Sequence, residues 1–164
     1  TADNMTDRMA ALNVLSHSNA PERDAALAAF HARYGDNALV LDKWFSVQAM
    51  STRADTPAAV AALMTHPDFS YTNPNRLRAL VGAYAANQVR FNAADGSGYR
   101  LVADAVLAVD ALNPQAAARL VSPLGRWKRF DTARAALMRA ELERIVATEG
   151  LSKDVFEIAS KSLV

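Results

Sequence analysis

The sequence contains no cysteine, which excludes disulfide cross-links and thiolate chemistry. A chain without cysteine suits a reducing compartment, so we expect a cytoplasmic protein. Long apolar runs are also missing. No stretch approaches the ~20 residues that a membrane-spanning helix needs, and the N-terminal segment lacks the basic and apolar regions of a secretion signal. The sequence therefore predicts a soluble chain with no membrane partner.

A charge excess of either sign is absent as well. Lysine and arginine total 18 residues against 17 aspartate and glutamate residues, so the net charge is +1 and exerts no global attraction on nucleic acid. One run, RWKRFDTARAALMR at 126–139, interleaves basic and aromatic side chains as nucleic-acid surfaces do. Glu141, Glu143 and Glu149 follow it closely. We therefore predict a solvated face there, and no nucleic-acid partner.

Catalytic motifs are missing too. The chain has no His-Glu-x-x-His zinc motif, no Gly-x-Ser-x-Gly elbow and no phosphate-binding glycine loop. Its histidines, His17, His31 and His66, lie in three different predicted segments, and an isolated histidine is more often a surface or capping residue than a metal ligand. The residues therefore predict no catalytic residue and no metal ligand in this chain.

What the chain does have is helical periodicity from one end to the other. Its 164 residues, 51% of them hydrophobic, are enough for one domain with its own core. Alternating β-branched runs are absent, so the fold class is all-α with about nine helices. They are predicted at 3–16, 21–35, 38–50, 56–65, 74–86, after the turn at 95–98, from 113–114, at 131–148 and after Ser152. The segment 38–50 is apolar nearly all round and should be the buried spine.

The segment at 73–86 combines a strong helix start with two arginines. Asn73-Pro74 supplies a capping oxygen and a first helical residue that needs no N–H partner. An apolar stripe follows, and it places Arg76 and Arg78 on opposite flanks. Gly82 lies on the flank of Arg78, where a small residue allows close approach of another backbone or of a ligand. The pattern alone leaves both alternatives open.

A second Asn-Pro segment, NPQAAARL, begins 40 residues after NPNRLRAL. This spacing lies within the range of two-helix solenoid repeats, although Asn-Pro is also a common helix start. Consecutive helical hairpins favour a curved α-solenoid over a four-helix bundle. Gln115 and Arg119 are four residues apart and share a helix face that alanines leave unobstructed. Arginine suits a carboxylate or a peptide carbonyl, and an ordinary helix surface is the alternative.

Six segments of the sequence carry a resemblance to a known protein family. ADNMTDRMAAL, LVLDKWFSVQA, NPNRLRALVGAY, FNAADGSGYRLVAD, NPQAAARL and LSKDVFEIASKSL occur in this order along essentially the whole chain. The sequence resembles the C-terminal domain of bacterial aminopeptidase N, the alanyl aminopeptidases of the zinc-dependent gluzincin class. The resemblance implies that residues 1–164 are a single C-terminal domain of a longer enzyme, that the chain begins inside that enzyme, and that Val164 is its end.

The resemblance also implies a fold and a role. The fold is a right-handed superhelix of antiparallel helix pairs, like armadillo or HEAT repeats, lying against an upstream catalytic domain. The enzyme removes N-terminal residues from peptides, and its zinc and catalytic residues belong to that upstream domain. The C-terminal domain closes an internal cavity and restricts peptide entry. The substrate-facing positions that it implies are Arg78, Gln115 and Arg119. A free-standing helical-repeat scaffold for protein partners is the alternative function.

Overall fold

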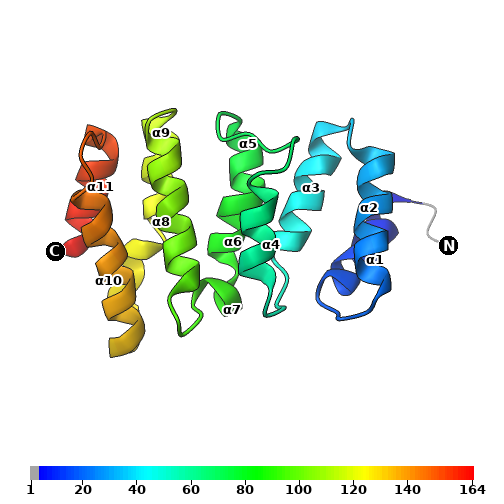
Figure 1. The fold of residues 1–164 in the computed structure, drawn as a ribbon, viewed down its shortest axis with the longest axis horizontal. Coiled ribbons are helices and arrows are strands. Elements are labelled where there is room, and N and C mark those ends of the chain that lie inside the picture. Colours follow the sequence, from blue (N-terminus) through cyan, green and yellow to red (C-terminus); the bar gives the residue numbers. More distant parts are fainter. Residues whose placement is uncertain (1–3) are drawn as a thin grey trace.

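The computed structural model describes residues 4–164, and all regular structure in this range is helical. Figure 1 shows the helices side by side in one row, with the first and the last described helix near opposite ends. The α-helices are α1 (Met5–Ser16), α2 (Glu22–Tyr34), α3 (Ala38–Ala49), α4 (Thr56–Leu63), α5 (Pro74–Leu77), α6 (Ala83–Ala86), α7 (Gln88–Phe91), α8 (Ser97–Asp110), α9 (Pro114–Val121), α10 (Thr132–Val146) and α11 (Lys153–Leu163). A π-helix, η1 (Arg78–Gly82), joins α5 to α6, and a 3₁₀-helix, η2 (Leu124–Arg129), precedes α10. This arrangement is the predicted all-α solenoid.

Asparagine side chains begin several of these helices. Asn73 accepts hydrogen bonds from the backbone N–H groups of Asn75 and Arg76, at 3.0 and 3.2 Å, and Asn113 accepts one from Ala116 at 3.0 Å. Each side chain satisfies a backbone donor that has no partner inside its helix. Both Asn-Pro segments therefore start helices, as predicted. The predicted start of the first helix at Asp3 lies outside the described residues.

The helix α3 is the spine that the sequence predicts. Seven of its residues are buried, and they face more than one neighbour: Val40, Leu41, Trp44, Phe45, Val47, Gln48 and Ala49. It packs against α1, α2, α4 and η1. In the C-terminal half, α8 takes the same position, with Val102, Ala105, Val106 and Val109 fully buried and α9 and α10 packed against it. The buried apolar residues form one contiguous core, so the chain has a hydrophobic core of its own.

The predicted helix at 74–86 has the right span but not the expected geometry. Its middle is the π-helix η1, in which backbone hydrogen bonds reach one residue further than in an α-helix. The predicted stripe is nevertheless buried: Leu77, Leu80, Val81 and Tyr84 are at most 3% exposed. Helix α7 is an addition to the nine predicted helices. None of the helices in residues 4–164 is long and apolar enough to cross a membrane.

Candidate functional site

The π-helix η1 places one arginine on an open surface. Arg78 is its first residue and is exposed, and its Nη2 donates to Asn75 Oδ1 over 3.2 Å. This partner is a neutral amide, so the charge of Arg78 is not neutralised by it. Single π-turns inside α-helices occur frequently at functional sites. Asn75 therefore orients the guanidinium group through one N–H, and the positive charge of Arg78 remains available to a ligand.

Helix α9 supplies the opposite side of the site. It begins at Pro114 behind the Asn113 cap, buries Ala117, Leu120 and Val121, and leaves Arg119 exposed. The burial of three apolar residues on the other side fixes the direction in which Arg119 points. The α5–α6 segment and α9 follow one another along the row of helices (Figure 1), so the two arginines reach the same region from different elements.

A hollow of about 350 Å³ lies between these two segments. It is lined by Pro74, Asn75, Leu77, Arg78, Gly82, Ala85, Ala116, Arg119, Leu120, Ser122, Pro123 and Arg126. Three of these residues are arginines and none is acidic. Among residues 4–164, no salt bridge joins Arg78, Arg119 or Arg126 to a carboxylate. We call this hollow the arginine groove. Guanidinium groups without a counter-charge are chemically suited to anionic or carbonyl-rich ligands.

Gly82 is part of the groove wall for a reason other than backbone strain. Its φ of −62° is an ordinary helical angle. A Cβ built on it would meet only the side chain of Arg78, at 3.4 Å, which is ordinary contact. Alanine would thus fit the backbone and improve helix propensity by ~1 kcal/mol. What the glycine provides is open space beside Arg78, which agrees with the close-approach alternative.

The three residues predicted to face substrate are not equally placed. Arg78 and Arg119 line the arginine groove together. Gln115 is exposed on the first turn of α9 and does not line the groove, although its neighbour Ala116 does. Arg126 lines the groove and was missed, because the sequence shows it only as part of a basic run on a solvated face. The sequence feature that could have indicated this role is the position of Arg126 just after the turn that ends α9.

The remainder of that basic run has a structural role. Trp127 Nε1 donates to the carbonyl oxygen of Ser162 over 2.8 Å, which ties η2 to the last helix. Arg139 pairs with Glu143 at 2.9 Å, and both side chains are exposed, which agrees with the predicted solvated face. The run therefore divides between the groove, the packing of α11 and the solvated surface.

Comparisons with known proteins agree with this architecture. The family described as "Domain of unknown function (DUF3458_C) ARM repeats" matches residues 1–164, so the chain belongs to this family of armadillo-repeat domains. It is similar to aminopeptidase N of Caulobacter vibrioides, at 50% identity over 163 residues, and to aminopeptidase N of Haemophilus influenzae (44%) and Escherichia coli (42%). Each alignment covers 99% of this chain but 19% of the relative.

A solved structure has the same fold. The crystal structure of Legionella pneumophila aminopeptidase A in complex with aspartic acid superposes with a TM-score of 0.94 at 36% identity. The superposition covers 98% of this chain and 19% of that one. The chain thus spans about a fifth of the length of the aminopeptidases that it matches, which agrees with its being one domain of such an enzyme.

Proposed function

We propose that this chain is the C-terminal domain of a zinc-dependent aminopeptidase, which releases N-terminal amino acids from peptides. In this proposal the domain closes the catalytic cavity, gates the entry of peptides and contributes substrate contacts. The observation that carries the proposal is the arginine groove, in which Arg78, Arg119 and Arg126 meet without an acidic partner. The parent enzyme in this proposal is inferred from the aminopeptidase N relatives, and this chain covers 19% of their length.

The chemistry of the groove suits a peptide. A guanidinium group donates two parallel hydrogen bonds to a carboxylate, and it also donates to backbone carbonyl oxygens. Arg78 and Arg119 stand on different elements, so they would hold one extended ligand at two points. Gln115 precedes the groove-lining Ala116 by one residue and would contact the same ligand at the edge of the groove. Small side chains at Gly82 and Ala85 leave room for the peptide backbone.

The zinc and the catalytic residues would belong to an upstream domain of the same chain. The residues present here do not fit a catalytic zinc of this class, because no His-Glu-x-x-His sequence occurs among them. His17 has a local partner instead, since its Nδ1 accepts a hydrogen bond from the Thr52 backbone N–H over 3.2 Å. In this proposal the chain by itself hydrolyses no aminoacyl substrate. Coding sequence upstream of Thr1 without the zinc motif would favour the free-standing scaffold.

The test is the substitution Arg119→Ala in the full-length enzyme. Hydrogen bonds to a charged group contribute ~1.5–3 kcal/mol, so kcat/KM for short peptides should fall roughly 10- to 150-fold. The loss should shrink for chromogenic substrates of one residue, because they lack the backbone and carboxylate that reach this domain. The measurement is kcat/KM for both substrate types, together with the melting temperature.

Arg139→Ala is the matched control. Arg139 is also an exposed arginine on a helix, but it pairs with Glu143 away from the groove. Its removal should leave both substrates unaffected. Equal losses on both substrate types for Arg119→Ala, accompanied by a lower melting temperature, would assign Arg119 to packing and contradict the proposed substrate contact.

A further inference from the structure

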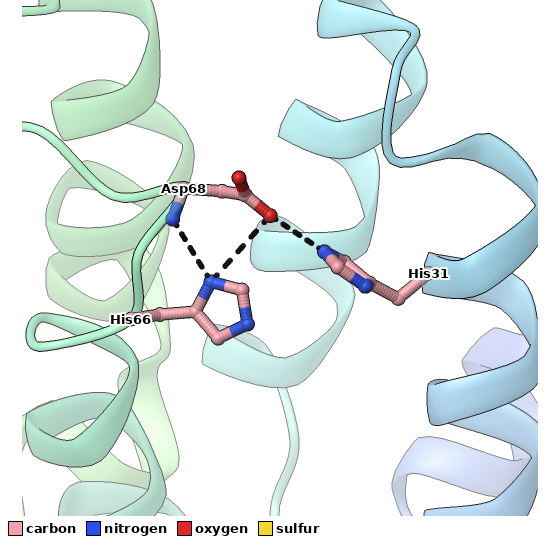
Figure 2. Close-up of side chains that lie close together, drawn as sticks. All are labelled: His31, His66 and Asp68. Carbon is pink, nitrogen blue, oxygen red and sulfur yellow. Dashed lines mark hydrogen bonds and ion pairs between the residues drawn. The ribbon is translucent and has the colours of Figure 1, made fainter.

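Two histidines that lie far apart in the sequence meet in the fold. His31 is in the last turn of α2, and His66 and Asp68 are in the segment that follows α4. The expectation that each histidine stands alone is wrong for this pair, because their ring centroids are 5.1 Å apart. Figure 2 shows Asp68 reaching from its segment toward His31, with His66 beside it. The fold therefore removes the ground on which the sequence excluded a metal ligand set.

The donor atoms converge on one point. His31 Nε2 is 2.7 Å from Asp68 Oδ2, and His66 Nδ1 is 3.7 Å from the same oxygen. One ligand atom from each of the three residues lies within 4.8 Å of the other two. In a tetrahedral zinc site with bonds of ~2.0–2.1 Å, the ligand atoms are about 3.3 Å apart. Shifts of about an ångström or less in side chains would bring the three atoms to that spacing.

The nitrogen of His66 that faces Asp68 carries a lone pair. The backbone N–H of Asp68 donates to His66 Nδ1 over 3.2 Å, and an N–H group can only donate, so Nδ1 is the unprotonated nitrogen of the neutral ring. This form binds metal ions. A cation would replace that long hydrogen bond, and it would also replace the proton between His31 and the carboxylate.

The surrounding residues hold the three ligands in place. The ring of Trp44 lies 4.8 Å from His31 and 5.4 Å from His66, between centroids. The buried Arg76 donates to the carbonyl oxygen of Asp68 over 2.9 Å, and its charge is balanced by Asp42 at 2.7 Å. Such supporting contacts fix the orientation of metal ligands.

Gly35, which follows α2, keeps the space beside His31 clear. A Cβ at this position would meet the His31 carbonyl oxygen at 2.9 Å and His31 Nε2 at 3.4 Å. The histidines are each less than a third exposed and Asp68 is 41% exposed, so the cluster is open to solvent on the side of the carboxylate. A cation and a water ligand have access from that side.

We propose that His31, His66 and Asp68 form a site for a divalent cation of the zinc type. Two imidazoles and one carboxylate match the ligands that zinc takes in proteins, with the fourth position left for water. Magnesium and calcium prefer sites made of oxygen alone, so they fit poorly. The ion would link α2 to the segment between α4 and α5. It would thereby join the helices α1 and α2 to the helices α3 and α4 that follow them.

The test is a calorimetric titration of the 164-residue chain with zinc chloride at neutral pH, with a large excess of Mg²⁺ present. We expect one zinc ion per chain. His66→Gln and Asp68→Asn should each weaken zinc binding at least ~10-fold, since second-shell changes already cost that much. Asp68→Asn retains the size of the side chain and an acceptor for His31. His17→Gln is the matched control and should bind zinc as the unmodified chain does.

Side-chain NMR of the unmodified chain gives a readout that needs no variant. Zinc should shift the imidazole nitrogen signals of His31 and His66 while those of His17 remain in place. Two outcomes would overturn the proposal. One is the absence of stoichiometric zinc binding in the unmodified chain, which leaves His31 and Asp68 an ion pair only. The other is equal affinity in the unmodified chain, His66→Gln and Asp68→Asn.

Discussion

Arg76 and Arg78 are two residues apart, yet the fold gives them opposite roles. Arg76 is 5% exposed, pairs with Asp42 at 2.7 Å and lies over the ring of Phe45 at 5.0 Å. Arg78 is exposed and has an amide as its hydrogen-bond partner. The buried ion pair joins α5 to α3, whereas an exposed arginine leaves the fold unaffected and is available to a ligand.

The pair makes a prediction about stability. Arg76→Ala should lower the free energy of unfolding by roughly 3 kcal/mol, because Asp42 would remain partly buried without its partner. Arg78→Ala should change that free energy by no more than about 0.5 kcal/mol, as an exposed substitution does. Urea denaturation of the two variants, followed by circular dichroism, checks both values. A destabilised Arg78→Ala would show that Arg78 has a packing role and weaken the case for the arginine groove.

At the scale of an element, α10 depends on one carboxylate at its start. Asp131 Oδ1 accepts a hydrogen bond from the backbone N–H of Arg134 over 3.0 Å, and Oδ2 pairs with the Arg134 guanidinium at 2.8 Å. The backbone hydrogen bond and the guanidinium lower the pKa of Asp131 below its usual value. A carboxyl whose pKa is lower in the folded chain stabilises the fold above the ordinary pKa, and this contribution is lost as the pH falls through the acid range.

Two substitutions separate the cap from the charge. Asp131→Ala removes both and should lower the melting temperature at neutral pH. Asp131→Asn keeps an oxygen acceptor but cannot be protonated, so it should lose less stability than the unmodified chain between about pH 5 and pH 3. Thermal melts across this range provide the measurement. The same acid sensitivity in Asp131→Asn and the unmodified chain would place the pH dependence on other carboxylates.

At the scale of the whole molecule, the row of helices leaves its two ends covered on one side only. Helix α1 buries just Leu12 and Ser16, and α11 buries Val155 and Ala159, whereas α3 and α8 bury seven and eight residues. In such repeat architectures each unit is stabilised by its neighbours, so local stability decreases toward the ends.

Hydrogen exchange measured by mass spectrometry tests this gradient. Amides of α1 and α11 should exchange faster than those of α3 and α8 in the 164-residue chain, because opening an end helix exposes less apolar surface. In the full-length enzyme, any end that contacts another domain should become more protected. Uniform protection along the isolated chain would show that it unfolds as one cooperative unit, and would contradict a repeat-like distribution of stability.

The sequence by itself determined most of the helices, because caps and apolar periodicity act within a few residues of each other, but it did not indicate η1 or α7. Asn73 and Asn113 each begin a helix through a side chain that binds backbone groups two or three residues ahead, and the apolar stripe of 77–84 is buried as its spacing predicts. The apolar pattern of 38–50 likewise predicts a helix that is buried on more than one side, as α3 is. These features require no knowledge of the partner elements.

Only the tertiary structure decided which side chains meet. The local pattern places Arg76 and Arg78 on comparable flanks, and only the packing buries Arg76 beside Asp42 of α3 while Arg78 stays exposed. Arg126 joins Arg78 and Arg119 because the turn after α9 brings η2 beside the groove. His31 and His66 are 35 residues apart and meet because α2 and the segment after α4 both pack over Trp44. Contacts between distant residues depend on how helices pack, and local periodicity carries no information on that packing.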